Sequence, residues 1–199
     1  MTTLTSTAIR TLSGPRVLKP REVKLLLKAP DLRTRRGRRD GAILAVLSCG
    51  GLRLGECCRL TISDIEIGKR IRITTRCAKS RGLRFRTITL PGPAARLLRD
   101  HLSHSEPRLF VFEGRRHEAL STRQAGRIVR YYLAKIGRSD LRPHSLRHSV
   151  GAIVTRQSGI WVAQKVLGHA SPTTTSRFYS AFDVTDADIA ADKLEEAMR

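Results

Sequence analysis

Six side chains with complementary chemistry are spread over four separate segments of the sequence. They are two arginines, a lysine, two histidines and a tyrosine: Arg53, Lys79, His144, Arg147, His169 and Tyr179. Arginine guanidinium groups bind the nonbridging oxygens of a phosphodiester in pairs and stabilise the charge of its transition state. Tyrosine supplies a nucleophile, histidine accepts its proton, and lysine or histidine protonates the leaving oxygen. Together these groups form the set that phosphoryl transfer without a metal ion requires.

Taken one at a time, the arginines and the first histidine have simpler explanations. Arg53 follows two glycines and precedes Glu56 by three residues, so a local salt bridge accounts for it. His144 and Arg147 are also three residues apart and share one face of a helix, which is often only a solvated face. The combination, and not any single residue, favours chemistry.

The remaining three candidates are equally ordinary in isolation. Lys79 lies between two predicted strands among many surface lysines. His169 follows Leu-Gly in a pattern that is also typical of a helix end. Tyr179 lies in a polar stretch, unlike the adjacent pair Tyr131 and Tyr132, yet a structural role is the default for one tyrosine.

The motifs that contain these residues resemble the tyrosine recombinases of the phage integrase family. GGLRLGECCRL, the lysine of the predicted hairpin, HSLRHS, LGH and the late tyrosine carry the resemblance, which extends from about Pro20 to Tyr179. The resemblance implies that Arg53 and Arg147 bind the scissile phosphate and that Tyr179 attacks it.

The resemblance also implies roles for the other candidates. Lys79 is the general acid on the departing 5′ oxygen, and His144 and His169 position the phosphate and manage protons. Glu56 matches the family's acidic residue near the first arginine and would orient Arg53, and His148 is a further supporting residue. The interval from His169 to Tyr179 is one residue longer than the family's spacing, and Pro172 is placed to start the helix that follows.

The implied function is site-specific DNA recombination through a 3′-phosphotyrosyl intermediate that leaves a free 5′ hydroxyl. The implied partner is double-stranded DNA, with self-association into a dimer or tetramer on it, and neither ATP nor a divalent metal nor another cofactor is needed. The residues leave integration, excision, inversion and resolution open. Two alternatives also stand: a relaxing enzyme similar to the type IB topoisomerases, and a non-catalytic DNA-binding protein derived from a recombinase.

Hydrophobic periodicity predicts an α+β fold that is mainly α-helical, with a small three-stranded antiparallel sheet. Helices are expected from Pro20, in the apolar run that begins at Gly41, and over residues 52–60, with a basic loop over Arg33–Arg39. Alternating apolar residues between Asp64 and Pro91 predict the strands, with turns at residues 68–69 and 80–82. Helices resume at Pro93 and fill most of the chain from Ser121, where Gln124 completes a capping box.

Three stretches differ in character and suggest the domain organisation. Residues 1–19 are expected to be a flexible lead-in, residues 20–182 the catalytic domain, and residues 183–199 an acidic tail. Family members place a helical DNA-binding domain before the catalytic one, so the chain is expected to be a stand-alone catalytic domain or a remnant of a longer element. The tail has the apolar positions Ile189, Leu194 and Met198 of an amphipathic helix, which would pack on a neighbouring subunit or on its own domain.

Charge points to nucleic acid as the partner. The 199 residues contain 38 Lys and Arg against 17 Asp and Glu, a net charge of +21, and six of the acidic residues lie in the tail. Such a charge attracts polyanions, although a generally arginine-rich protein is the plainer explanation of any one arginine. The hydrophobic fraction of 40% is enough for a folded core.

The sequence contains no apolar run long enough to span a membrane and no signal peptide, so we expect a cytoplasmic protein. The cysteines Cys49, Cys57, Cys58 and Cys77 lack metal-binding spacing and are expected to be reduced, partly buried thiols.

Overall fold

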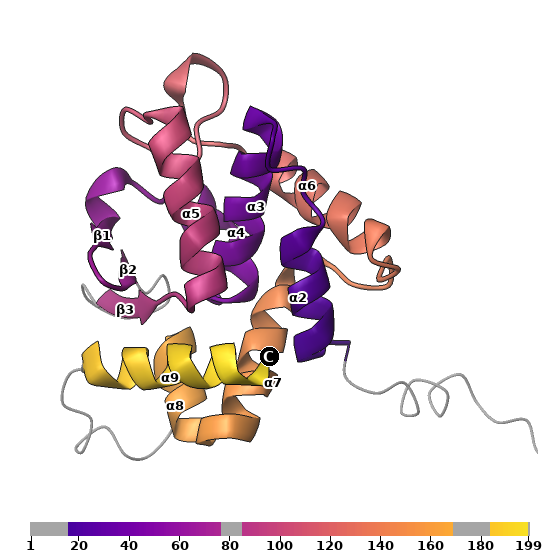
Figure 1. The fold of residues 1–199 in the computed structure, drawn as a ribbon, viewed down its shortest axis with the longest axis vertical. Helices are drawn as coiled ribbons and strands as arrows, with labels where there is room; N and C mark the ends of the chain where they lie inside the picture. Colours follow the sequence, from indigo (N-terminus) through magenta and orange to yellow (C-terminus); the bar gives the residue numbers. More distant parts are fainter. Residues whose placement is uncertain (1–15, 77–84, 169–183, 199) are drawn as a thin grey trace, which may run out of the picture.

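Helices make up most of the protein, which the computed structural model describes over residues 16–76, 85–168 and 184–198. The sheet lies beside α5 at one side, and α7, α8 and α9 form a layer across one end (Figure 1). The predicted mainly helical α+β fold is confirmed. The helices are α2 (Pro20–Lys28), α3 (Arg35–Ser48), α4 (Leu54–Cys58), α5 (Gly92–Ser105), α6 (Thr122–Lys135), α7 (Pro143–Ser158), α8 (Ile160–Leu167) and α9 (Val184–Ala197), with short 3₁₀ turns at Ile62–Asp64 and Arg115–His117.

The sheet has the predicted three antiparallel strands, β1 (Ile65–Ile67), β2 (Ile71–Arg76) and β3 (Phe85–Thr89), in the order β1-β2-β3. Ile73 of β2 pairs with Ile65 on one side and Ile88 on the other, which puts apolar side chains in register on the face toward the helices. The first predicted turn lies at residues 68–70, and the second, at residues 80–82, is outside the described residues.

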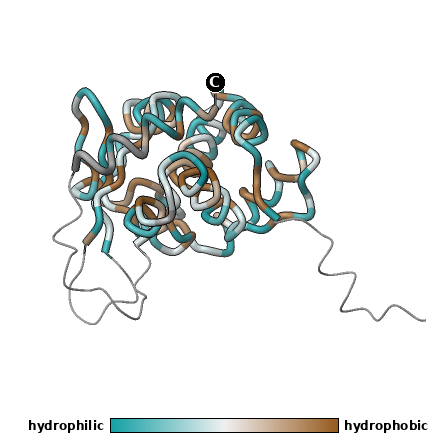
Figure 2. The backbone as a smooth tube through the Cα atoms, turned by 90° about the horizontal axis from the view of Figure 1, so that it is seen from below, coloured by the Kyte–Doolittle hydropathy of each residue, from teal (hydrophilic) through white to brown (hydrophobic). Residues whose placement is uncertain are grey.

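Helix α3 forms the centre of the core. Every residue from Ala42 to Leu47 is at most 1% exposed, and the helix packs mainly against α5. Hydrophobic stretches of the backbone gather in the interior and hydrophilic ones lie around the edge (Figure 2). The predicted buried helix is therefore confirmed, and it ends at the glycine pair as expected. The helix predicted over residues 52–60 is shorter, because α4 extends only from Leu54 to Cys58.

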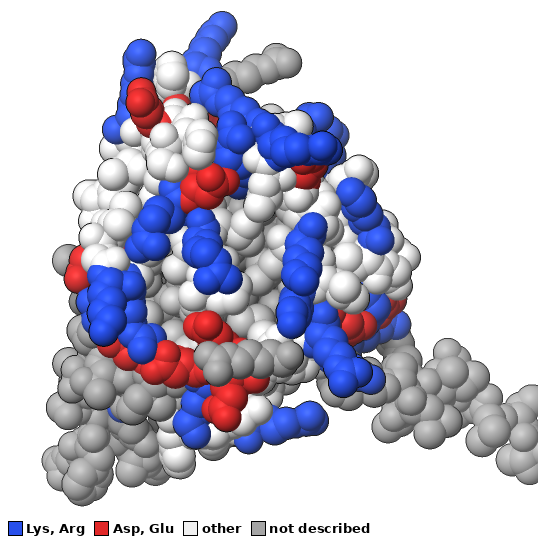
Figure 3. Space-filling view, viewed as in Figure 1, with Lys and Arg blue, Asp and Glu red and all other residues white. Residues whose placement is uncertain are grey.

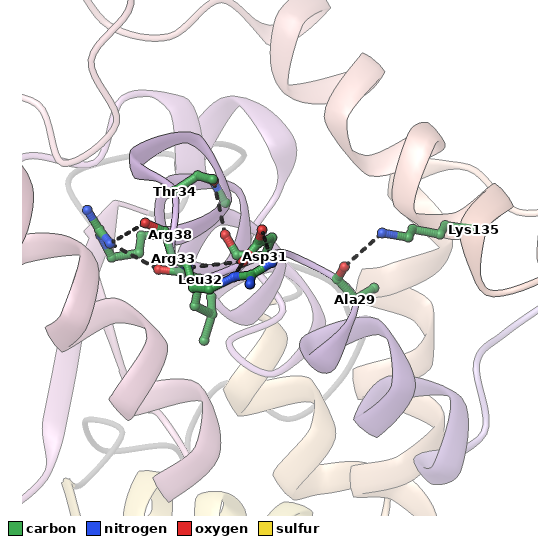
Figure 4. A network of polar contacts seen from close by, with 8 residues as sticks. Ala29, Asp31, Leu32, Arg33, Thr34, Arg38 and Lys135 are labelled. Atoms are coloured by element: carbon green, nitrogen blue, oxygen red, sulfur yellow. Dashed lines mark hydrogen bonds and ion pairs between the residues drawn. The ribbon is translucent and has the colours of Figure 1, made fainter.

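The predicted basic loop over Arg33–Arg39 is wrong, because α3 already begins at Arg35. The Oγ1 atom of Thr34 caps the helix by accepting a hydrogen bond from the Gly37 N–H at 2.9 Å. Asp31 fixes the preceding turn through Arg33 and Thr34, and the Arg38 guanidinium donates back to the carbonyls of residues 32 and 33 (Figure 4). A threonine cap thus outweighs the run of like charges.

The N-terminal stretch predicted to be a lead-in is packed where it is described. Leu18 is 1% exposed, and its N–H donates to Ser149 Oγ of α7 at 2.7 Å. Arg138 also donates to the Val17 carbonyl and forms an ion pair with Glu22 at 2.7 Å. Residues 17–19 therefore belong to the folded body, and residues 1–15 are outside the described residues.

The predicted capping box at the start of α6 is confirmed, since Ser121 Oγ accepts a hydrogen bond from Gln124 N. The thiols of Cys49, Cys57 and Cys58 are free and buried, and burial raises the pKa of Cys49 to about 12. Cys77 lies outside the described residues. Among the helices of the described ranges, none combines the length and apolarity that crossing a membrane needs.

The acidic tail forms α9, which packs on its own domain against α7, α8 and β3. Two acidic residues of α9 bind the sheet: Asp192 pairs with Arg70 at 2.7 Å, and Asp188 accepts hydrogen bonds from Arg72 at 3.1 Å and Thr89 at 2.6 Å. Burial raises the pKa of Asp188, but these two partners lower it more, so its net pKa is below the usual value. In Figure 3 lysines and arginines are spread over the visible face, while acidic side chains gather in a band over α9.

Apolar contacts complete the docking of α9. Leu194 and Met198 are 2% and 6% exposed and join the main core, and Glu195 accepts a hydrogen bond from Gly92 N at the start of α5. Of the predicted apolar positions, the Ile189 side chain is outside the described residues. In the structure α9 lies on the domain's own surface, which is one of the two locations that the sequence left open.

We predict that Leu194→Ala lowers the free energy of unfolding by about 2 to 5 kcal/mol, because it removes buried methyl groups and leaves a cavity between α9 and the body. Chemical denaturation followed by circular dichroism measures the change. The matched control is Leu25→Ala, whose side chain is 55% exposed on α2 and should cost much less. Equal losses in the two variants would contradict the packing of α9.

Candidate active site

Arg147 joins three segments at the centre of the site. It lies in the second turn of α7 and is 3% exposed. Its Nη1 donates to the Gly51 carbonyl at 2.6 Å, and its Nη2 donates to the Leu167 carbonyl at the end of α8. These partners are 96 and 20 residues away in sequence, so one guanidinium fixes α7 to the α3–α4 connection and to α8.

Glycine is required where these segments meet. Gly51 has φ +65°, and a Cβ on it would lie 2.9 Å from Leu167 Cδ2 and 3.3 Å from Val150 Cγ1. At the end of α8, Gly168 adopts φ +60° and caps the helix, as the Leu-Gly-His pattern predicts. The close approach that brings the Gly51 carbonyl to Arg147 therefore leaves no room for a side chain.

Arg53 begins α4, two residues after the carbonyl that Arg147 binds. Its Nη1 is 2.7 Å from Glu56 Oε1, and its backbone N–H donates to Glu56 Oε2 at 2.8 Å. The predicted pair with Glu56 is thus confirmed. The Arg53 side chain is 26% exposed and the Glu56 side chain 5%, so a buried carboxylate restrains an arginine that solvent reaches.

Arg86 is a third arginine of the site, and sequence reasoning missed it. It lies on β3, its side chain is 2% exposed, and its Nη2 is 2.8 Å from Glu56 Oε2. Burial raises the pKa of Glu56, but Arg86 and Arg53 lower it more, and the net pKa is below the usual value. Strand alternation was the available signal, because Arg86 falls on the same face as the predicted inward residues Ile88 and Leu90.

His144 and His148 lie on the exposed side of α7, with ring centroids 4.4 Å apart and rings nearly perpendicular. Partial burial lowers the pKa of His144, and the nearby charges of His148, Arg147 and Arg53 lower it further. A neutral imidazole in this position is able to accept a proton at neutral pH.

The charges of the site do not cancel. Arg53, Arg86 and Arg147 contribute three positive charges and Glu56 one negative charge, all of them mostly withdrawn from water. Such an excess beside a partly exposed arginine favours binding of an anion. Within residues 16–76, 85–168 and 184–198, no three His, Cys, Asp or Glu side chains lie together as metal ligands would.

Three predicted site residues, Lys79, His169 and Tyr179, lie outside the described residues. The chain containing Lys79 connects β2 to β3, and the chain containing the other two connects α8 to α9. Of the predicted set, the structure thus brings together Arg53, Arg147 and His144, along with the supporting residues Glu56 and His148.

A second basic region lies at the start of α3. A cleft of about 550 Å³ there is lined by arginines and a histidine from α3 and the segment before α6: Arg35, Arg36, Arg39, Arg116 and His117 are among them. A further cleft shares Arg36 and Arg39 and continues to Arg127 of α6. The lining of this groove also includes Glu113, which pairs with His117, and Asp40, which pairs with Arg39. Arginines outnumber these two acidic residues, so the groove keeps an excess of positive charge suited to a polyanion.

The chain resembles several known proteins in sequence. A sequence model of the Phage integrase family matches residues 16–184. Tyrosine recombinase XerC of Roseiflexus castenholzii is 33% identical over 173 residues, covering 81% of this chain and 54% of the relative. Tyrosine recombinase XerA of Pyrococcus furiosus is 36% identical over 166 residues, covering 81% of this chain and 56% of the relative. The chain thus spans about half the length of the curated relatives it matches.

Solved structures share the fold. The crystal structure of XerA recombinase superposes with a TM-score of 0.66 at 25% identity, covering 90% of this chain and 61% of that one. The XerH site-specific recombinase bound to a palindromic difH substrate gives a TM-score of 0.66 at 21% identity, covering 79% of this chain and 47% of that one. The arrangement of helices and sheet is therefore that of these recombinases.

We predict that the pKa of His144 lies below 6.5, its ordinary value, and rises in the variant Arg53→Ala, because removal of a neighbouring positive charge favours the protonated imidazole. NMR titration of the histidine side chains measures both values. The control variant Arg59→Ala removes an exposed arginine that is not among the charges acting on His144, so it should leave the pKa of His144 unchanged. An unchanged pKa of His144 in Arg53→Ala would place Arg53 too far from it to share a ligand.

Proposed function

The chain belongs to the phage integrase family, and from this premise we propose that it is a site-specific recombinase that breaks and rejoins DNA through a tyrosine–phosphate bond. The observation that carries the proposal is the meeting of Arg53 and Arg147 beside His144, from segments about ninety residues apart, in a region with excess positive charge. A phosphodiester is the ligand whose charge and bidentate oxygens suit two guanidinium groups.

In the proposed reaction the Tyr179 oxygen attacks the scissile phosphorus and loses its proton to a histidine, His144 or His169. The bond from phosphorus to the 5′ oxygen breaks, and Lys79 protonates that oxygen, which leaves a 3′-phosphotyrosyl diester and a free 5′ hydroxyl. The charge that grows on the nonbridging oxygens is stabilised by Arg53 and Arg147. Because the ester is conserved, a 5′ hydroxyl of a second duplex reverses the step and exchanges the strand.

The lowered pKa of His144 supports its part as a proton acceptor, because the base must be neutral before the tyrosine is deprotonated. The ion pair with Glu56 supports the part of Arg53, because it holds the guanidinium in one place before DNA arrives. Arg147 is restrained more strongly, by two carbonyl groups. Both arginines are therefore preorganised, which lowers the cost of organising the transition state.

Double-stranded DNA is the proposed partner. The similar XerH structure is bound to a palindromic difH substrate, and that of the Tn1549 transposon integrase is a complex with circular intermediate DNA. The arginine groove at α3 and α6 is suited to hold a phosphate backbone without reading sequence. Exchange between two duplexes requires a tyrosine for each strand that is broken, so we propose self-association on DNA as a dimer or tetramer. We propose the cytoplasm as the place of action.

We propose further that residues 20–182 form the catalytic domain, with residues 17–19 packed on it. Residues 183–199 are proposed as a C-terminal segment whose helix α9 closes one end of that domain. The apolar burial of Leu194 and Met198 supports this division, since both side chains of α9 join the core of the domain.

We predict that the protein forms a covalent adduct with nicked suicide duplexes from the DNA flanking its gene, and that Tyr179→Phe forms none, because phenylalanine lacks the attacking oxygen. Denaturing gel electrophoresis detects the adduct. Tyr131→Phe is the matched control, since Tyr131 is 62% exposed on α6 and should leave the adduct unchanged. An undiminished adduct in Tyr179→Phe would overturn the proposed nucleophile.

Assays with the same purified protein distinguish a recombinase from the two alternative functions. Recombination predicts that adducts form only on particular inverted repeats and that strands are exchanged between two such sites. Relaxation of supercoiled plasmids that lack those repeats indicates instead a type IB topoisomerase-like enzyme. Sequence-specific binding that weakens steeply with salt, without any adduct, indicates a DNA-binding protein that does not cleave.

We predict that Arg53→Ala slows cleavage of the suicide duplex by roughly 10²- to 10³-fold, because it removes a donor that stabilises charge in the transition state. DNA affinity should change little, since one phosphate contact among many is lost. Single-turnover cleavage and gel-shift titration measure the two effects. The control Arg59→Ala removes an exposed arginine just after α4 and should cleave at the wild-type rate. A parallel loss of rate in both variants would contradict a specific role for Arg53.

A further inference from the structure

Arg86 is a buried cation that the proposed mechanism does not use. It lies on the face of β3 toward the helices, opposite Thr75 of β2, and its side chain is 2% exposed. Its Nη2 binds Glu56 Oε2, yet its Nε and Nη1 are buried and have no hydrogen-bond partner among the residues that the structure describes. An apolar side chain at this inward position would avoid the cost of two buried, unpaired N–H groups. Packing alone therefore does not account for an arginine here.

Within the described part of the chain, Arg86 pairs with Glu56, a residue that also binds Arg53. Both oxygens of Glu56 are occupied: Oε1 by the Arg53 guanidinium at 2.7 Å, and Oε2 by Arg53 N and by Arg86 Nη2, each at 2.8 Å. Rotation of the Glu56 carboxylate would break the contact to Arg86 together with the contacts to Arg53. Arg86 thus fixes the plane of the Glu56 carboxylate, to which Arg53 is hydrogen-bonded.

The contact also links two parts of the fold. Glu56 belongs to α4 and Arg86 to β3, which begins directly after the connection that contains Lys79. Among the described residues, this ion pair is the charged contact that ties β3 to α4. Under the proposed function, Arg53 at the start of α4 binds the phosphate, and the pair joins α4 to the strand that follows the connection containing Lys79.

We propose that Arg86 is a positioning residue for strand cleavage, which holds the Glu56 carboxylate in place so that Arg53 is restrained at the phosphate and the hairpin is anchored to α4. The proposal rests on the proposed function for its effect on the reaction. The restraint of Arg53 itself is a property of the free protein and is measurable without DNA.

The test compares the wild-type protein with Arg86→Met, which keeps the length of the side chain without its charge. In the free protein, ¹⁵N NMR of the arginine side chains reports rotation about the Nε–Cζ bond of Arg53, whose signal is assigned by its absence in Arg53→Lys. We expect this rotation to be faster in Arg86→Met. Single-turnover cleavage is expected to slow by roughly 10- to 100-fold, the loss typical of a misplaced catalytic group, with little change in DNA affinity.

Two further variants keep the test decisive. Arg86→Lys retains the positive charge, so its Arg53 rotation rate and its cleavage rate should be closer to the wild-type values than those of Arg86→Met. This comparison separates the loss of the charge from a loss of stability in Arg86→Met. Arg72→Met is the matched control, because Arg72 is an arginine of the neighbouring strand that pairs with Glu66 and Asp188 and not with Glu56. It should leave both the Arg53 signal and cleavage unchanged.

The inference is overturned if the Arg53 side chain rotates at the wild-type rate in Arg86→Met. It is also overturned if Arg86→Met slows cleavage by the same factor in the Arg53→Ala background as in the wild-type background, because Arg86 would then act independently of Arg53. Absence of any adduct with the wild-type protein overturns the proposed function instead. In that case the NMR comparison alone decides whether Arg86 restrains Arg53.

Discussion

The buried guanidinium of Arg147 is the contact on which the rest of the site depends. A charge that is 3% exposed is costly unless it is hydrogen-bonded, and its partners include two backbone carbonyls from the α3–α4 connection and the end of α8. Backbone carbonyls cannot rotate away as side chains do. Arg147 therefore sets where Gly51 lies, and because Arg53 follows two residues later, it also sets where α4 begins.

The large positive charge of the chain is divided among different tasks. In the sheet, Arg70 and Arg72 are paired with acidic residues of α9, so this part of the excess is neutralised within the domain. Around Glu56 three arginines share one carboxylate, and around the start of α3 several more line a groove. The net charge of +21 is thus unevenly distributed: the acidic tail neutralises part of the positive charge near the sheet, and the two regions proposed to bind DNA keep an excess of cations.

The sequence predicted the features that depend on contacts between residues close together in the chain. The Arg53–Glu56 pair, the Ser121 cap, the buried run of α3 and the alternation of the strands each involve neighbours within four residues or one strand, and the structure confirms them. The start of α3 was missed because a capping threonine outweighed a run of like charges.

The contacts of Arg147 and Arg86 could not be predicted from the sequence, for a different reason. Their partners are backbone carbonyls or a carboxylate at least 20 residues away, and only the packed fold chooses them. The motif that contains Arg147 indicated its importance, but not that it would be buried. Nothing in the composition distinguishes Arg86 from the many other arginines, apart from its inward position in β3.

The two arginines assigned to the phosphate are restrained in different ways, and this difference has a consequence. Arg147 is locked by the backbone and buried, so its position changes only if the packing of α3, α7 and α8 changes. The Arg53 side chain is partly exposed and, among the described residues, pairs with Glu56, which also pairs with Arg86 across the boundary between helix and sheet. A movement of the hairpin would therefore be transmitted to Arg53 and not to Arg147. The site is thus preorganised in two ways: Arg147 is held rigidly in the helical core, and Arg53 is coupled through Glu56 and Arg86 to the strand that follows the connection containing Lys79.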